Sequence, residues 1–371
     1  MATSQFTIYS SSDVGGPGLM TGWSGSLIRI LDACLVDGYS GKTKAGWTHP
    51  IANSASFGPT SVYACYKPPS GSMMTLFVND NFPNITALGR EAWLTGWENM
   101  TSLCNTTPVL NVGAGTGQFP TPAQQLTTGH VVCRKSSLSD NTTGHYWVMF
   151  ADAYTFYLCI QTGDTTGYYY SVTFGDVFSF KGSTDAYRCL LIGRVVENVA
   201  GVGNTTSGNN PATSTNDSFA ASWGDFPSGG GSYNMFLPIY LPGHFMPRTF
   251  GGGGASINVG KTFDMSKASS SGFVGNGQRY GLVPMYGFLQ TPNGSDNSLY
   301  ISPVTIHDPL SLSLRGRMRG FWFVAHPIIN FSDGQTFQGA GDYAGKTFMI
   351  VKTDPTGGFF AIETSNTVET N

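Results

Sequence analysis

The chain has 371 residues and a formal net charge of −3; only 11% of the residues are charged, whereas 13% are aromatic and 49 residues are Gly. Ordinary globular domains are about 25% charged and about 7% Gly. The aromatic content and low net charge exclude a disordered protein, and they argue against a nucleic-acid binder, which needs clustered Lys and Arg to neutralise phosphates. We expect a folded, β-rich protein whose surface, made mostly of Ser, Thr, Asn and Gly, packs against neighbours.

The first predicted element is an amphipathic helix from Ser24 to Asp37. Its apolar residues recur at i, i+3, i+4, i+7 and i+8, the spacing of one helical face, and are Leu27, Ile30, Leu31, Cys34 and Leu35. Ser24 or Ser26 is predicted to cap the N-terminus, and Gly38 is predicted to end the helix. A second, short helical turn is predicted after Pro120, in FPTPAQQL.

Most of the remaining chain is predicted to form strands and turns. The predicted strands are rich in aromatic or β-branched residues and are bounded by Gly, Pro, Asn or Asp. They are Val62–Tyr66, Met73–Val78, Glu91–Glu98, Tyr146–Phe150, Thr155–Ile160, Tyr168–Phe174, Tyr187–Arg194, Tyr233–Leu241, Tyr300–Thr305, Gly320–Ala325, Thr347–Val351 and Gly358–Glu363. Strands do not alternate with long helices, which disfavours a doubly wound sheet. The expected fold is mainly β, an antiparallel sandwich or barrel-like set of sheets with one short N-terminal amphipathic helix.

The composition changes most clearly over residues 198–232, where Gly, Ser, Thr, Asn, Ala and Pro dominate. Such a segment is a linker or a long exposed loop. We therefore predict three parts: an N-terminal β-rich unit with the helix (residues 1–197), the linker or loop (residues 198–232) and a C-terminal β-rich unit (residues 233–371).

The N-terminal sequence, MATSQFTIYSSSDVGGPG, has no basic region followed by an apolar one, so no secretory signal is expected. No run approaches the roughly 18 apolar residues of a membrane-spanning helix, so we expect no membrane insertion.

Six cysteines occur, at Cys34, Cys65, Cys104, Cys133, Cys159 and Cys189. Neither CxxC nor a Cys/His spacing typical of zinc is present. Four of the six lie in apolar runs, where a thiol behaves as a small hydrophobic group, whereas Cys104 and Cys133 have more polar neighbours. We expect most of the six to be unpaired and buried.

Three GKT triplets occur, at Gly41–Thr43, Gly260–Thr262 and Gly345–Thr347. A phosphate-binding loop needs Gly, four residues, and then Gly-Lys-Ser/Thr at the start of a helix. Val36, Ala255 and Ala340 stand where that first Gly is required, so none of the triplets fits. The glycines of Gly251–Gly254 lack the GxGxxG context and are interpreted as a flexible turn or a close packing contact.

The six histidines are His49, His130, His145, His244, His307 and His326, and no two have metal-ligand spacing. The members of a Ser/His/Asp triad are distant in sequence, so spacing alone leaves such a triad open, but no GxSxG elbow marks a nucleophile. The sequence therefore predicts no catalytic, cofactor-binding or metal-binding residue, and no enzyme activity.

Arg315, Arg317 and Arg319 alternate along LRGRMRG, which indicates one edge or face of a sheet rather than a nucleic-acid site. The aromatic runs Tyr168–Tyr170 and Phe321–Phe323 could stack on sugars. Consecutive residues of a strand point to opposite faces, so a sheet buried on both faces also explains these runs, and this interpretation is favoured.

Several segments together resemble a family of uncharacterised virion-associated proteins of tailed bacteriophages. They are LIRILDACLVDGY with GKTKAGWT, FPTPAQ, ADAYTFYL, FGDVFSFKGSTDAYRCLLIGR, FGGGG, LYISPVTIHDPLSLSLRGRMRGFW and GAGDYAGKTFMIVKTDPTGGFFAIETSNTVETN. The similarity runs from about Ser26 to Asn371 and is weakest across residues 198–232. The segments are specific as a series and carry no catalytic signature.

The resemblance implies a structural virion component of the tail, baseplate or fibre region. Its partners would be other virion proteins and copies of itself, and it would be made and assembled in the host cytoplasm, where reduced cysteines are expected. Two alternatives remain open from the sequence: a host-surface or carbohydrate-binding module of the tail, and a head decoration protein. A depolymerase-like enzyme would require a cleft with clustered acids or a His-centred triad.

Overall fold

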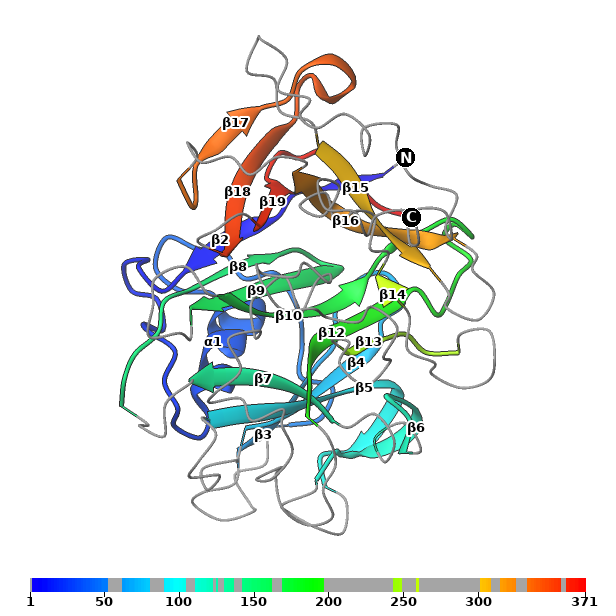
Figure 1. Cartoon of the computed structure of the whole chain (residues 1–371). Coiled ribbons are helices and arrows are strands. Elements are labelled where there is room, and N and C mark those ends of the chain that lie inside the picture. The colour runs from blue at the N-terminus through cyan, green and yellow to red at the C-terminus, as the bar shows by residue number, and fades with distance from the viewer. Residues whose placement is uncertain are drawn as a thin grey trace, which may run out of the picture.

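The computed structural model describes residues 2–52, 62–80, 90–104, 111–122, 125, 130–136, 142–161, 169–196, 243–248, 258–259, 301–307, 314–324, 332–354 and 358–371. Strands make up about half of the residues that the structure describes, and one helix of 12 residues lies near the N-terminus (Figure 1). The sheets are antiparallel. The predicted fold class is therefore confirmed.

The predicted helix begins as α1 (Ser26–Leu31) and continues as a π-helix, η1 (Asp32–Asp37). The residues predicted to form its apolar face are all at most 1% exposed: Leu27, Ile30, Leu31, Cys34 and Leu35. Gly38 ends the helix with a φ of 77°, a left-handed value that favours glycine, as predicted.

The predicted capping of this helix by Ser24 or Ser26 is wrong. The residue before the first helical turn is Gly25, which makes no side-chain cap. Instead, Asp80 Oδ2 accepts hydrogen bonds from the backbone N–H groups of Leu27 at 2.8 Å and Ile28 at 3.3 Å. A distant carboxylate therefore satisfies the amides that a local Ser or Thr usually serves.

The larger sheet contains eleven strands. They are β2 (Thr7–Ser10), β3 (Tyr63–Tyr66), β4 (Thr75–Asn79), β5 (Arg90–Ser102), β6 (Ala114–Phe119), β7 (His130–Ser136), β8 (Trp147–Ala151), β9 (Thr155–Gln161), β10 (Tyr169–Asp176), β12 (Cys189–Val196) and β13 (Gly243–Phe245). Their order is β2-β8-β9-β10-β12-β7-β5-β4-β3, with β13 on β12 and β6 on β5.

Strand β12 joins two halves of this sheet. Its first part pairs with β10 through Ile192, and its last part pairs with β7 from Arg194 onwards. Gly193 lies between the two pairings, where an added Cβ would approach Val131 to 2.7 Å. A residue without a side chain therefore lets β7 approach closely at the junction.

A second, seven-stranded sheet lies above the larger one in Figure 1. Its strands are β11 (Phe178–Ser179), β14 (Asn258–Val259), β15 (Ile301–His307), β16 (Leu314–Val324), β17 (Thr336–Gln338), β18 (Thr347–Asp354) and β19 (Gly358–Glu363). The order is β14-β15-β16-β19-β18-β17, with β11 on β16. A two-stranded sheet pairs β1 (Thr3–Ser4) with β20 (Val368–Glu369), so segments from both ends of the chain lie side by side.

The buried apolar side chains follow these layers. The main core joins the helix to strands of both halves of the eleven-stranded sheet, from β3 and β4 to β9 and β10. A second core lies between the β8–β12 half and the seven-stranded sheet. Two smaller groups cover the far face of the seven-stranded sheet, around Trp322, and the outer face of β3–β5, around Phe77. Along strands such as β8 and β9, successive apolar side chains therefore belong to the two different cores.

Every predicted strand overlaps an observed one except Tyr233–Leu241, which lies outside the described residues. Nine described strands were not predicted: β1, β2, β6, β7, β11, β13, β14, β17 and β20. Of the longer ones, β6 contains two glycines, and β7 has a short apolar run between polar residues. After Pro120, the N–H of Gln125 donates to the carbonyl of Thr121 at 2.9 Å, the i to i−4 bond of the predicted helical turn.

Residues 198–232 lie outside the described part of the chain, so the three-part division stays a prediction. Strand β13, which follows that segment in sequence, pairs with β12, and β11, which precedes it, pairs with β16. Each of the two predicted units therefore contributes a strand that pairs with a strand of the other unit.

Five cysteines are buried and form no disulfide, all of them within the described residues: Cys34, Cys65, Cys133, Cys159 and Cys189. Cys104 is partly exposed. Burial raises the pKa of the Cys65 thiol to about 11, so it stays protonated at neutral pH. These thiols fill space in the cores, as the apolar runs around most of them predicted.

Candidate functional site

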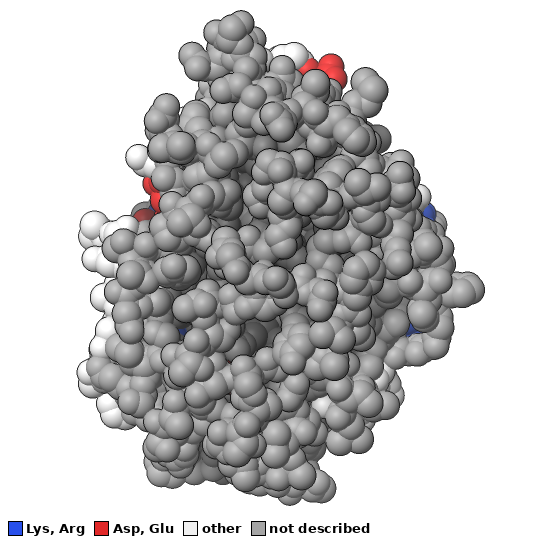
Figure 2. Space-filling view, in the orientation of Figure 1, with Lys and Arg blue, Asp and Glu red and all other residues white. Residues whose placement is uncertain are grey.

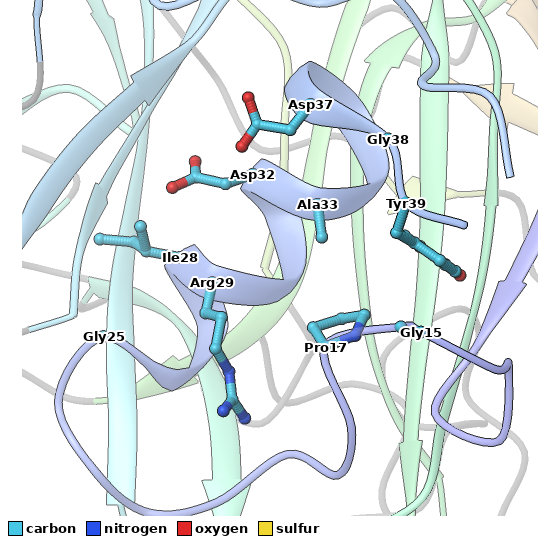
Figure 3. A pocket seen from close by; sticks show the side chains of 11 residues that line it. Gly15, Pro17, Gly25, Ile28, Arg29, Asp32, Ala33, Asp37, Gly38 and Tyr39 are labelled. Carbon is cyan, nitrogen blue, oxygen red and sulfur yellow. The ribbon is translucent and has the colours of Figure 1, made fainter.

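An open cavity of about 470 Å³ lies beside the outer face of the helix (Figure 3). It is lined by residues of the loop between β2 and the helix, of the helix itself and of the segment directly after it: Gly15, Gly16, Pro17, Gly25, Ile28, Arg29, Asp32, Ala33, Asp37, Gly38 and Tyr39. The amphipathic helix places its apolar face inward, and its polar residues Arg29, Asp32 and Asp37 line this cavity together with Ile28 and Ala33.

The carboxylates of Asp32 and Asp37 point to the same side of the helix in Figure 3, and Arg29 extends toward the loop. Arg29 Nη2 donates to the carbonyl of Leu19 at 3.1 Å. The Tyr39 hydroxyl donates to Asp13 Oδ2 at 2.6 Å. The cavity is therefore polar and charged at one end, with an aromatic ring held in place at the other.

Behind the cavity, Asp32 is already engaged. Its Oδ1 accepts the Tyr66 hydroxyl at 2.7 Å and lies 3.2 Å from His49 Nε2. His49 Nδ1 lies 2.8 Å from the carbonyl of Cys65. Both ring nitrogens thus face oxygen acceptors, which favours the doubly protonated imidazolium, and the hydrogen bond to Asp32 is the main cause of the raised pKa of His49.

Two of the titratable groups near the cavity are already engaged or buried. Asp32 is committed to Tyr66 and His49, and the nearby thiol of Cys34 is fully buried with a pKa raised by burial. Among the described residues, no group of three or more His, Cys, Asp or Glu side chains could hold a metal ion. Carboxylate, guanidinium and phenol groups around an open cavity can exchange hydrogen bonds with a polyhydroxylated ligand.

Two further ion pairs, Lys135 with Asp80 and Arg188 with Asp176, are buried away from the cavity. Lys135 Nζ lies 2.5 Å from Asp80 Oδ1, and both side chains are 0% exposed. Asp176 is 2.7 Å from Arg188 Nε and also accepts the backbone N–H of Ser72 at 2.8 Å. Each of these carboxylates accepts backbone N–H groups as well as a cation, so they fasten turns and element ends.

The three arginines of LRGRMRG occupy alternate positions of β16, as predicted, and each pairs with an acid from another segment. Arg315 Nη2 lies 2.8 Å from Asp185, and Arg319 Nη2 lies 2.7 Å from Asp152. Arg317 contacts Glu369 of β20. We call these three pairs the arginine row; they attach the seven-stranded sheet to the rest of the molecule.

Other sequence motifs are dispersed. Gly41 lies in a two-residue turn between the paired Tyr39 and Lys42, and Gly345 lies in the turn before β18, so neither GKT triplet begins a helix. The triplet at residues 260–262 and the glycines 251–254 lie outside the described residues. His130, His244 and His307 lie on β7, β13 and β15, His145 pairs with Met20, and His326 lies outside the described residues.

The aromatic run after Gly320 is divided between two cores, as the alternation predicts. Phe321 belongs to the core facing the eleven-stranded sheet, and Trp322 belongs to the core on the far face. Both are buried, so these two rings form no exposed shelf for sugar stacking. For the other run, the backbone of Tyr169 and Tyr170 lies in β10, and Tyr168 lies outside the described residues.

The sequence did not single out His49, Asp32 or Tyr66. They lie in a loop, the helix and β3, and only the fold brings them together. The one available signal was the position of Asp32 and Asp37 on the polar side of the predicted helix.

No protein-family model matches this chain, and no curated protein matches it significantly. Within the described residues, no helix is long and apolar enough to cross a membrane.

Proposed function

We propose that this protein is a non-enzymatic structural component of a tailed-phage virion, in the tail, baseplate or fibre region, and that it assembles in symmetric copies with other virion proteins in the host cytoplasm. The proposal rests first on the series of segments that resembles virion-associated proteins. A head decoration protein would have the same kind of structural role, but on the head of the virion.

One structural observation supports the proposal further: several of the few charged side chains are buried in ion pairs inside the protein. Lys135, Arg188, Arg315, Arg319 and Lys346 are all engaged in ion pairs, with side chains no more than 18% exposed. In Figure 2 the described atoms are visible mainly at the edges of the view, where a few of them are red or blue. In the whole chain, only 11% of the residues are charged. A surface with few solubilising charges suits contact with neighbouring subunits.

The test is to locate the chain in purified particles. We expect an antibody against the purified protein to label tails in immunogold micrographs, and quantitative mass spectrometry of tail fractions to give a fixed copy number. Labelling of heads would support the decoration role. Absence of the chain from purified particles would contradict the proposal.

The polar segment over residues 198–232 gives a second test. If it contacts a neighbouring subunit, removing several of its Gly, Ser and Thr residues should leave the melting temperature unchanged but abolish incorporation into particles, because changes in loop length cost little. Normal incorporation of the shortened chain would leave the segment as a linker.

The helix-side cavity supports the second candidate, a host-surface glycan-binding role. Asp37 is exposed, and its carboxylate points to the same side as that of Asp32 (Figure 3). We would compare binding of the native chain and Asp37→Ala to a microarray of bacterial surface glycans, with exposed Lys44→Ala as the control. Binding lost only in Asp37→Ala would favour this role, and no binding by the native chain would count against it.

A further inference from the structure

The pair formed by Lys135 and Asp80 differs from the other ion pairs described in its isolation from water. Both side chains are 0% exposed, and Nζ lies 2.5 Å from Oδ1. Lys135 lies on β7, and Asp80 directly follows β4; β5 lies between these two strands in the sheet. Ala92 of β5, which pairs with Cys133, has only a methyl side chain, so the two longer side chains can meet across β5.

Hydrogen bonds hold both members of this pair in place. Lys135 Nζ is also held by the carbonyl of Trp23 at 2.7 Å. The other carboxyl oxygen, Asp80 Oδ2, accepts two backbone N–H groups from the start of the helix, those of Leu27 and Ile28. Paired N–H donors on one oxygen are the arrangement that stabilises the oxyanion of a tetrahedral intermediate in acyl transfer.

The low polarity of the site favours the uncharged form of the Asp80 carboxyl. Burial raises the pKa of the Asp80 carboxyl, although the charge of Lys135 opposes this. Transfer of a proton from the ammonium to the carboxylate gives an amine facing a carboxylic acid, and neither group can exchange with water in the buried site.

We propose that Lys135 and Asp80 join in an intramolecular amide bond. Nζ attacks Asp80 Cγ, Oδ2 carries the negative charge between the two backbone N–H groups, and Oδ1 takes the protons released from Nζ and leaves as water. One N–C bond forms and one C–O bond breaks, with no oxidant or cofactor. The bond ties β4 to β7 and leaves Oδ2 as the carbonyl oxygen that caps the helix.

The experiment is denaturing intact-mass spectrometry of the full native chain, followed by tandem mass spectrometry of its proteolytic peptides. We expect a mass lower than that of the unmodified chain by one water, and a branched peptide joining residue 135 to residue 80. Lys135→Arg retains a cation but has no amine that forms this bond, so its mass should show no water loss. The native mass alone decides the matter if that variant does not fold.

The same digest contains an internal control. Lys346 lies 2.9 and 3.1 Å from the two carboxyl oxygens of Glu363, but its side chain is 18% exposed and Thr367 and Ser365 also donate to that carboxylate. We expect the peptides carrying Lys346 and Glu363 to be unlinked. A native chain of unmodified mass, or a water loss whose fragments place it anywhere other than between residues 80 and 135, would overturn the proposal.

Discussion

The helix-facing side of the eleven-stranded sheet and the side that faces the seven-stranded sheet are closed by different means. On the helix side, apolar residues of the helix and of at least seven strands form one continuous core. On the opposite side, an apolar core is accompanied by the arginine row, with Arg315 and Arg319 buried against Asp185 and Asp152.

The difference concerns specificity. Apolar contact is non-directional, so the helix could settle against the sheet in several ways without its anchoring at Asp80. A buried guanidinium needs its own carboxylate, because leaving either charge alone in the interior costs several kcal/mol. The arginine row therefore favours one placement of β16 against the first sheet, and the predictions below test whether the two sides respond differently.

The largest effect is expected from Arg319→Met. Arg319 contacts Asp152 Oδ1 at 3.1 Å and Oδ2 at 2.7 Å and donates to Ser4 Oγ at 2.6 Å. Its loss leaves a buried carboxylate without its cation and should lower the free energy of unfolding by about 3–5 kcal/mol. Urea denaturation measures this loss, and Arg317→Met is the control because Arg317 is 25% exposed. Equal losses in the two variants would contradict a special role for the buried pair.

On the helix side, Leu31→Ala should lower the free energy of unfolding by about 2–5 kcal/mol, because Leu31 is 1% exposed and its removal leaves a cavity. Arg29→Ala on the exposed side of the same helix is the matched control and should change stability by less than about 0.5 kcal/mol. If Leu31→Ala were as mild as the control, the helix would not be part of the main core in solution.

A smaller effect is expected on the pH dependence of stability, through His49. The pKa of His49 is raised above its ordinary value of 6.5 by Asp32, with further contributions from the Cys65 carbonyl and from Asp37, while burial opposes the shift; the Tyr66 ring lies 5.0 Å away. A group whose pKa is higher in the folded state stabilises it fully below the unfolded pKa, and this contribution is lost as the pH rises through the folded pKa.

The measurement is the melting temperature between about pH 6 and pH 9 for the native chain and for His49→Gln. The native chain should lose stability over this range more steeply than the variant. Parallel curves for the two proteins would show that the His49 and Asp32 contact contributes nothing to stability.

The smallest effect is expected at the surface. Arg248 forms two hydrogen bonds to the carboxylate of Glu98, at 2.7 and 2.8 Å, but its side chain is 58% exposed. Exposed pairs of this kind contribute little. Arg248→Ala should leave the melting temperature unchanged within error, and a marked decrease would mean that β13 depends on this contact.

Local patterns in the sequence were sufficient for much of the fold. Helical periodicity identified five buried residues of the helix, and runs of aromatic and β-branched residues located eleven of the twenty described strands. The cap at Asp80 was not predictable, because rules for helix ends consider only neighbouring residues. The His49 and Asp32 contact was hidden for the same reason: it joins a loop to a helix through tertiary structure, and no spacing rule describes it.

The cap formed by Asp80 also determines when the helix can become stable. Leu27 and Ile28 depend on a carboxylate that lies 53 and 52 residues further along the chain. A 12-residue helical segment is marginal in water by itself, and contacts of high sequence separation form late. The helix, although it was recognised from local periodicity alone, therefore becomes stable only after β4 has docked. We expect its first amides to lose hydrogen-exchange protection together with those of β4.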